Sequence, residues 1–268
     1  MSTVFITSLI SITAYLLAGT LLLRQFFNPA PAAVSAKVPQ LSMMLGILAH
    51  LLILVLSLYH LGNEKLSLSF VTLTLAFLVT ISMFFLNQYI KNLVFLPIVC
   101  LLSSLFVFLN IVLPSTTNID ANMNAGMIAH ISLSIIAFGL LSISALYALQ
   151  LSYINYQLKH KRKTMLHSDL PPLLLVEDIL YKLMLAGTIV LGTSLVSGFI
   201  FLPNMFAEGY AHKTILSSVA LLIFSVSLIF HRWQGLKARH AVVINVIGLS
   251  ILALAYFGSR IVQEFIIG

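Results

Sequence analysis

Eight apolar segments follow one another along the chain, and each is long enough to cross a lipid bilayer. They lie at roughly 4–23, 39–61, 68–86, 92–113, 126–151, 179–202, 214–230 and 241–260. A spanning α-helix needs about 20 predominantly apolar residues, whereas the strands of a membrane barrel show about ten residues of alternating polarity. These segments do not alternate. The sequence therefore predicts an all-α, polytopic membrane bundle of about eight transmembrane helices, forming a single transmembrane domain over 1–268.

The composition leaves little chain for anything outside the membrane. Of the 268 residues, 60% are hydrophobic and 8% are charged, whereas roughly a quarter are charged in soluble domains. The mean hydropathy is +1.08. These values exclude a water-soluble enzyme. A cleavage-like box follows the first segment at Val34-Ser35-Ala36, but the apolar stretch is too long for a signal peptide and Arg24 follows it, so we expect a retained helix.

Basic residues predict the orientation of the bundle. The chain has 14 Lys and Arg against 7 Asp and Glu, and in a membrane protein such an excess reports topology rather than nucleic-acid binding. One side holds Arg24, Lys37, Lys91, Lys159, Lys161, Arg162, Lys163, Lys182, Arg232, Lys237 and Arg239, and the other holds Lys65, Lys213 and Arg260. The positive-inside rule makes the first side cytoplasmic and places both termini outside. The basic cytoplasmic loop 152–178 is then expected to contact anionic lipid headgroups, with a specific partner as the alternative.

The acidic residues exclude several classes of function. They are Glu64, Asp120, Asp169, Glu177, Asp178, Glu208 and Glu264, and none falls in the middle of a predicted span. This distribution weighs against an ion-coupled transporter, a hydrolase with paired carboxylates and a carboxylate magnesium site. The sequence also has no glycine-rich phosphate loop and no nucleophile elbow. We therefore expect no enzyme, and we disfavour a small-solute transporter.

Small and hydroxyl residues predict where the helices approach each other. Gly187, Gly192 and Gly198 are expected to allow close packing of the sixth helix. Ser132, Ser134, Ser142 and Ser144 are expected to form hydrogen bonds from the fifth helix to its neighbours.

Four of the eight histidines occupy positions in the predicted bundle that need explaining. His50 is near the centre of the second span, His130 opens the fifth on the outer side, and His212 and His231 bound the seventh. A helix rises about 1.5 Å per residue, so His212 and His231 lie about 28 Å apart and cannot share a metal ion. A deep pair of His50 with His231 and an outer pair of His130 with His212 would suit haem iron, because neutral imidazole is its usual axial ligand. The alternative is that these histidines form interhelical hydrogen bonds.

Several short motifs resemble the cytochrome c assembly protein family, which includes the CcsA, CcmC and HemX types. They are GMIAHISLS at 126–134, ALYALQL at 145–151, PPLLLVE at 171–177, LGTSLVSGFIFLP at 191–203, HKT at 212–214, FHRWQG at 230–235 and AYFGSR at 255–260. The resemblance covers all eight predicted helices and is most specific in the second half of the chain.

The resemblance implies roles for individual residues. His50 and His231 match the two transmembrane histidines of the family, and His130 matches its first external histidine, an axial haem ligand. Two family features are missing: a tryptophan-rich external motif, since Trp233 is the only tryptophan, and a second external histidine, since residues 260–268 contain none. His212 or His60 is a candidate for the missing ligand, and loss of the outer site is the other interpretation.

The resemblance thus implies a multi-pass protein of the bacterial inner membrane that binds haem and assists haem handling or cytochrome maturation. Its expected partners are the lipid bilayer, haem and other membrane or cytochrome-maturation proteins. The alternative is a HemX-like regulatory or scaffold protein without stable haem, in which the loop 152–178 is the functional part.

Overall fold

The computed structural model describes residues 2–27, 37–61, 68–90, 95–112, 125–159, 171–202, 211–235 and 238–258. These residues form eight α-helices and one short π-helix, without any strand. Seven of the α-helices are long and apolar enough to cross a membrane, and the remaining one, at Leu96–Val112, is a shorter apolar helix. The predicted all-α membrane bundle is confirmed.

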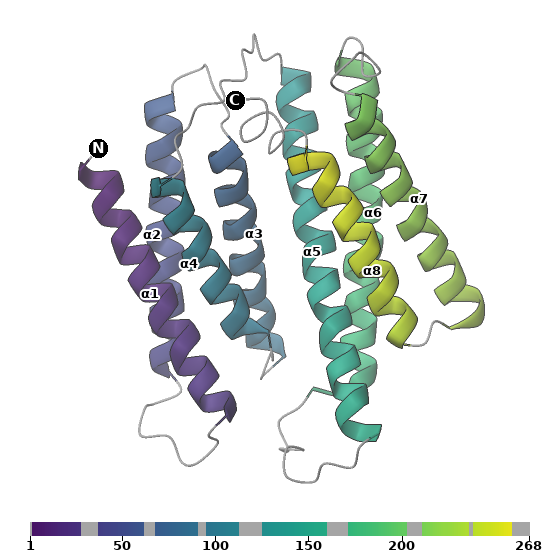
Figure 1. The fold of residues 1–268 in the computed structure, drawn as a ribbon, viewed down its shortest axis with the longest axis horizontal. Helices are drawn as coiled ribbons and strands as arrows, with labels where there is room; N and C mark the ends of the chain where they lie inside the picture. Colours follow the sequence, from purple (N-terminus) through teal and green to yellow (C-terminus); the bar gives the residue numbers. More distant parts are fainter. Residues whose placement is uncertain are drawn as a thin grey trace. The chain divides into compact units, whose positions relative to one another are not determined.

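The first compact unit, Met1–Asn122, is a ring of four helices. It contains α1 (Ser2–Phe27), α2 (Lys37–Leu61), α3 (Leu68–Tyr89) and α4 (Leu96–Val112). Helix α1 packs on α2 and α4, and α3 packs on the same two helices. Within this unit α2 and α3 stand upright, and α1 and α4 are tilted across them (Figure 1). Ile53, Leu54, Leu73 and Val107 form a buried apolar core.

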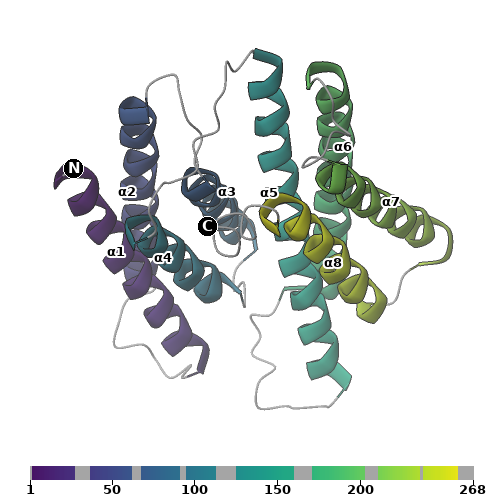
Figure 2. The ribbon, with the colours of Figure 1, turned by 45° about the horizontal axis from the view of Figure 1, so that its top comes forward.

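The second compact unit, Met123–Gly268, is a second ring of four helices. It contains α5 (Ala125–Lys159), α6 (Leu173–Phe201), α7 (Ala211–Gln234), α8 (Ala238–Ala253) and the π-helix η1 (Leu254–Gly258). Helices α5 and α6 pack along each other, α8 packs on α5, and α7 packs on α6 and α8. Figure 2 shows α7 and α8 tilted relative to α5 and α6. The single transmembrane domain expected over 1–268 stays a prediction.

Local sequence explains where several helices begin. Pro39 lies in the first turn of α2 and Pro97 in that of α4, where the missing N–H would have no partner within the helix. Pro172 precedes the first residue of α6. Gly187 allows close packing of α5 on α6, as predicted, because a Cβ there would lie 2.8 Å from Cγ of Leu141.

Helical structure extends from both sides into the predicted cytoplasmic loop 152–178, whose place outside the membrane stays a prediction. Helix α5 continues to Lys159, and α6 begins at Leu173. Ile154 and Gln157 are buried, as is Val176 on α6, so tertiary packing extends both helices past their apolar runs. Most of the basic cluster over 159–163 lies outside the described residues.

The outer surfaces of the helices are strongly apolar. Phe199 is 70% exposed, Ile200 66% and Leu222 65%. Contiguous apolar surface of this kind is unfavourable in water but matches the hydrocarbon of a bilayer. The burial pattern therefore supports membrane insertion independently of helix length.

Candidate functional site

His50 lies in the middle of α2 and is completely buried inside the first unit. Its Nδ1 atom is 3.2 Å from the hydroxyl oxygen of Tyr15 on α1. The rings of Tyr15 and Phe77 meet the imidazole edge-on, with centroid distances of 5.9 and 5.5 Å. The Leu73 backbone also interacts with the ring, but among the described residues Nε2 has no hydrogen-bond partner of ordinary geometry. The imidazole is therefore held at one nitrogen and unsatisfied at the other.

Two hydroxyl groups beside Tyr15 link α3 and α4. The Thr80 side chain interacts with Tyr15, and its hydroxyl donates to the Ala76 carbonyl at 2.7 Å. The Ser103 hydroxyl contacts that of Thr80. All these side chains are buried. We use the name His50 cluster for Tyr15, His50, Phe77, Thr80 and Ser103.

The Tyr15 ring occupies space that exists only because residue 46 is glycine. A Cβ at Gly46 would lie 2.7 Å from Cδ1 and 2.8 Å from Cε1 of Tyr15. Ser11, one turn before Tyr15, donates a hydrogen bond of 3.2 Å to the Gly46 carbonyl. Helices α1 and α2 are therefore in close contact one turn before His50.

His130 lies in the second turn of α5 and is half-buried. Its Nδ1 atom is 2.7 Å from the carbonyl oxygen of Ser194 on α6 and 3.3 Å from the hydroxyl of Ser197. A carbonyl only accepts, so Nδ1 carries the proton and Nε2 keeps its lone pair. Ser134 donates to the His130 carbonyl at 2.9 Å and contacts the Ser194 hydroxyl at 2.6 Å. These four residues form the His130 cluster.

The π-helix at the end of α8 packs against the His130 cluster. The Tyr256 hydroxyl donates to the carbonyl of Ser134 at 3.3 Å. Phe138 on α5 meets the rings of Tyr256 and Phe257 edge-on at 5.5 and 5.7 Å. Single π-helical turns occur frequently at functional sites. Tyr256 therefore contacts α5 one turn after His130.

His231 lies near the end of α7 and stacks on Tyr181 of α6, with ring centroids 3.3 Å apart and planes inclined by 14°. Within the described part of the chain, neither Nδ1 of His231 nor the Tyr181 hydroxyl has a hydrogen-bond partner, although both atoms are buried. Glu177 interacts electrostatically with both residues. These three residues line a groove of about 690 Å³, together with the charged side chains of Lys182 and Arg232.

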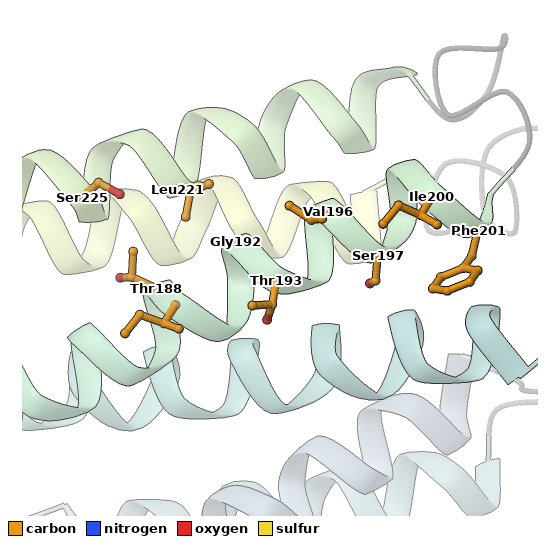
Figure 3. Close-up of a pocket in the computed structure, with 10 residues that line it drawn as sticks. Thr188, Gly192, Thr193, Val196, Ser197, Ile200, Phe201, Leu221 and Ser225 are labelled. Carbon is orange, nitrogen blue, oxygen red and sulfur yellow. The ribbon is translucent and has the colours of Figure 1, made fainter.

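A second groove, of about 570 Å³, borders the His130 cluster (Figure 3). Val196 and Leu221 form part of its apolar walls. Gly192 was predicted to allow close packing, but it leaves the groove open, because the nearest atom to a Cβ there is Cδ1 of Leu221 at 3.8 Å. Ser197 lines the groove, points toward α5 in Figure 3 and contacts His130. The groove therefore begins beside the imidazole.

The predicted histidine pairs are not brought together by any described contact. The hydrogen bonds of His130 go to α6, while His212 is exposed at the start of α7. His50 and His231 belong to different units, so both predicted pairs stay predictions. The side chain of His60 lies outside the described residues. No group of three His, Cys, Asp or Glu side chains suited to a metal ion occurs in the described ranges, but haem iron needs only one or two axial side chains.

Sequence reasoning missed three buried residues that organise these regions. Tyr15 and Tyr181 contact histidines, but tyrosine in an apolar span carries no distinguishing signal. Asn245 on α8 had a signal, because an amide inside a span needs partners. It accepts from Ser144 at 3.0 Å and donates to Met184 Sδ at 3.6 Å, which links α8 to α5 and α6. The predicted interhelical bonding of Ser134 and Ser144 is thus confirmed.

Comparison with known proteins identifies relatives that share much of the chain. The Escherichia coli K12 protein described as inner membrane protein YpjD is 38% identical over 171 residues, which are 64% of this chain and 65% of that protein. The YpjD protein of Escherichia coli O157:H7 shows the same identity and coverage. An uncharacterized 28.8 kDa protein in the nifR3-like 5′ region of Azospirillum brasilense is 32% identical over 144 residues, 52% of each chain. No solved structure matches the chain.

The sequence model of the family described as cytochrome C assembly protein matches residues 38–267. The match contains His50, the His130 cluster and the groove at His231, whereas α1, with Tyr15, precedes it. The seven long apolar helices and the inner-membrane relatives make this chain a multi-pass protein of the inner membrane. Because the family model matches most of its length, the chain belongs to the cytochrome c assembly protein family.

Proposed function

We propose that this protein binds haem inside the membrane and assists haem handling or cytochrome maturation, as an accessory and not as a catalyst. The proposal depends chiefly on His50, a completely buried imidazole that is held at Nδ1 and lacks a hydrogen-bond partner of ordinary geometry at Nε2. A buried polar atom without a partner costs about 1–3 kcal/mol. Coordination of haem iron by Nε2 would remove this cost, since neutral imidazole is a usual axial ligand.

His130 and His231 have features that suit the same role. In His130, donation from Nδ1 to the Ser194 carbonyl fixes the tautomer and leaves Nε2 available. Ligating histidines almost always donate their second ring N–H to a carboxylate, a backbone carbonyl or water. At His231, Nδ1 is buried without a partner beside Glu177, which could accept its proton.

The surroundings of these histidines suit a large apolar cargo. The grooves beside His130 and His231 have volumes of about 570 and 690 Å³, within the range of small-molecule sites. Lys182 and Arg232 at the second groove offer positive charge for the carboxylates of a tetrapyrrole. The family description adds cytochrome c assembly as the process in which such a cargo would be used.

An absorption spectrum tests the proposal. The full-length protein is purified in detergent, as isolated and after incubation with haem, and its spectrum is recorded before and after dithionite. We expect a Soret band and a sharp reduced α-band in the wild type, with large losses in His50→Ala and His231→Ala. His240→Ala is the matched control, because His240 is exposed at the start of α8.

A colourless wild type that takes up no added haem would contradict the proposal. The HemX-like scaffold would then be the better account. A spectrum that both His50→Ala and His231→Ala leave unchanged would also contradict it, because haem would be bound without these two ligands.

A further inference from the structure

We propose that the groove at His231 binds the headgroup of a zwitterionic phospholipid, phosphatidylethanolamine, with the phosphate at Arg232 and the ammonium group at Glu177. The groove is formed by α6 and α7, and its volume is about 690 Å³. The inference does not rest on haem binding. If haem enters the same groove, the two ligands compete for Arg232 and for the exposed side of the histidine.

The groove lies at the level expected for lipid headgroups. The 29 residues of α6 rise about 43 Å, which matches the thickness of about 40–45 Å of a bilayer with its headgroup layers. Glu177 is in the second turn of α6, and Arg232 is in the last turn of α7. The positive-inside rule predicts that this end of both helices is cytoplasmic. We therefore expect the groove to face the headgroups of the cytoplasmic leaflet.

The charges of the groove favour a ligand that carries both signs. Two cations, Lys182 and Arg232, and two carboxylates, Glu177 and Asp178, line it, so their formal charges cancel. Purely basic pockets between membrane helices bind anionic headgroups instead. Lys182 and Asp178 pair at 2.8 Å, which is the only ion pair among the described residues of the groove. Arg232 and Glu177 are therefore left for a phosphate and an ammonium group.

Two buried polar atoms on the floor of the groove lack partners. Tyr181 is only 7% exposed, and its ring stacks on His231. In the described part of the chain, neither the Tyr181 hydroxyl nor Nδ1 of His231 has a hydrogen-bond partner. Buried polar groups are almost always hydrogen-bonded. A phosphate oxygen in the groove would accept from the tyrosine hydroxyl, and this buried donor distinguishes the groove from an ordinary charged surface.

The apolar walls of the groove indicate a whole lipid rather than a free phosphate or amine. Leu185 and Ile229 line the groove and are 49% and 48% exposed. They belong to the outer apolar surface, which matches hydrocarbon. Acyl chains can lie on these side chains while the headgroup occupies the charged part of the groove. A small polar ion would leave them uncovered.

The groove also distinguishes a primary ammonium group from a quaternary one. A primary ammonium group has three protons to donate, as in lysine, and Glu177 lines the groove as an acceptor. A trimethylammonium group donates none and is recognised by cages of aromatic rings. One face of Tyr181 is covered by His231 at a centroid distance of 3.3 Å, so this ring pair does not form a cage. Phosphatidylethanolamine therefore fits better than phosphatidylcholine.

The test measures lipid binding to the full-length protein by native mass spectrometry in detergent. The protein is titrated with phosphatidylethanolamine, phosphatidylcholine and phosphatidylglycerol that carry identical oleoyl chains. The variants are Arg232→Gln, Glu177→Gln and Tyr181→Phe. The matched control is Arg239→Gln, which removes the same charge from an exposed residue at the start of α8. Thermal unfolding establishes that each variant is folded.

We expect one molecule of phosphatidylethanolamine to bind the wild type and the Arg239→Gln control about 10-fold more tightly than either other lipid, as for one hydrogen bond to a charged group. Arg232→Gln should weaken this binding about 10-fold, and Tyr181→Phe should weaken it severalfold. Glu177→Gln should abolish the preference over phosphatidylcholine, because the ammonium group then loses its charged acceptor.

Two results would overturn the inference. Tightest binding of phosphatidylglycerol would show that the groove acts as a basic site for anionic lipid. Equal binding of the three lipids, or an affinity for phosphatidylethanolamine that Arg232→Gln and Glu177→Gln leave at the control value, would show unspecific lipid around the bundle. The measurement uses no haem, so its failure is distinct from a failure of the proposed function.

Discussion

Nδ1 of His130 on α5 and the carbonyl oxygen of Ser194 on α6 are 2.7 Å apart. A backbone carbonyl in a helix normally accepts only from the N–H four residues later. Here the Ser194 carbonyl also accepts from a histidine of another helix, and this contact connects α5 to α6. Ser194 also contacts the Ser134 hydroxyl at 2.6 Å. The two helices are therefore joined at one level by both a ring nitrogen and a pair of hydroxyls.

Replacing the paired hydroxyls should weaken this junction. We expect Ser134→Ala and Ser194→Ala each to lower the free energy of unfolding by about 0.6 kcal/mol, the mean for interhelical hydrogen bonds in membranes, and by no more than about 1.7 kcal/mol, the largest such value. The double variant should lose less than the sum, because both changes remove the same contact. Unfolding in detergent with increasing denaturant measures these values. Ser218→Ala is the control, since Ser218 is exposed and its hydroxyl donates within its own helix.

The space at Gly46 should be intolerant of any side chain. Gly46→Ala places a methyl group within 2.7 Å of the Tyr15 ring and should destabilise the protein by about 1–3 kcal/mol, as overpacking does. The same change at Gly192, where the nearest atom is 3.8 Å away, should be close to neutral. Thermal unfolding of the two variants in detergent compares them. Equal stability would show that Tyr15 is not held against Gly46.

Asn245 should be an essential polar contact of the second unit. It is completely buried, and its amide joins Ser144 to the Ala241 carbonyl and to Met184. Asn245→Leu removes these hydrogen bonds and leaves their buried partners unsatisfied. It should therefore lower the free energy of unfolding by about 1–3 kcal/mol. The matched control is Thr193→Val, because Thr193 is exposed and donates within α6. A stability change no larger than that of the control would contradict the role assigned to Asn245.

The predicted orientation can be tested with thiol chemistry. Cys100 is the only cysteine and is completely buried, so it should react slowly with a membrane-impermeant maleimide. In a Cys100→Ser background, Gly268→Cys should be labelled from outside intact spheroplasts, and Lys163→Cys only after lysis. Labelling in the opposite order would reverse the topology given by the positive-inside rule.

The candidate site was only partly visible in the sequence. His50 and His130 stood out, because an ionisable ring in or at the end of an apolar span needs a partner. Their partners did not stand out, since Tyr15 is 35 residues from His50 and Ser194 is 64 residues from His130. Nothing in the local pattern of α1 distinguishes Tyr15 from an ordinary interfacial or core tyrosine.

By itself, the sequence determined the class of fold, because apolar segments of bilayer length must satisfy their backbone groups internally and so become helices. It also determined which ionisable rings lie in those helices. The tertiary structure decided which nitrogen of His50 and of His130 is held, and where α5 ends and α6 begins. Those outcomes depend on contacts between helices, such as Tyr15 against Gly46 and Val176 and Gln157 in the α5–α6 pair. Packing of this kind is set by shape and hydrogen-bond geometry in three dimensions, which periodicity along one chain does not encode.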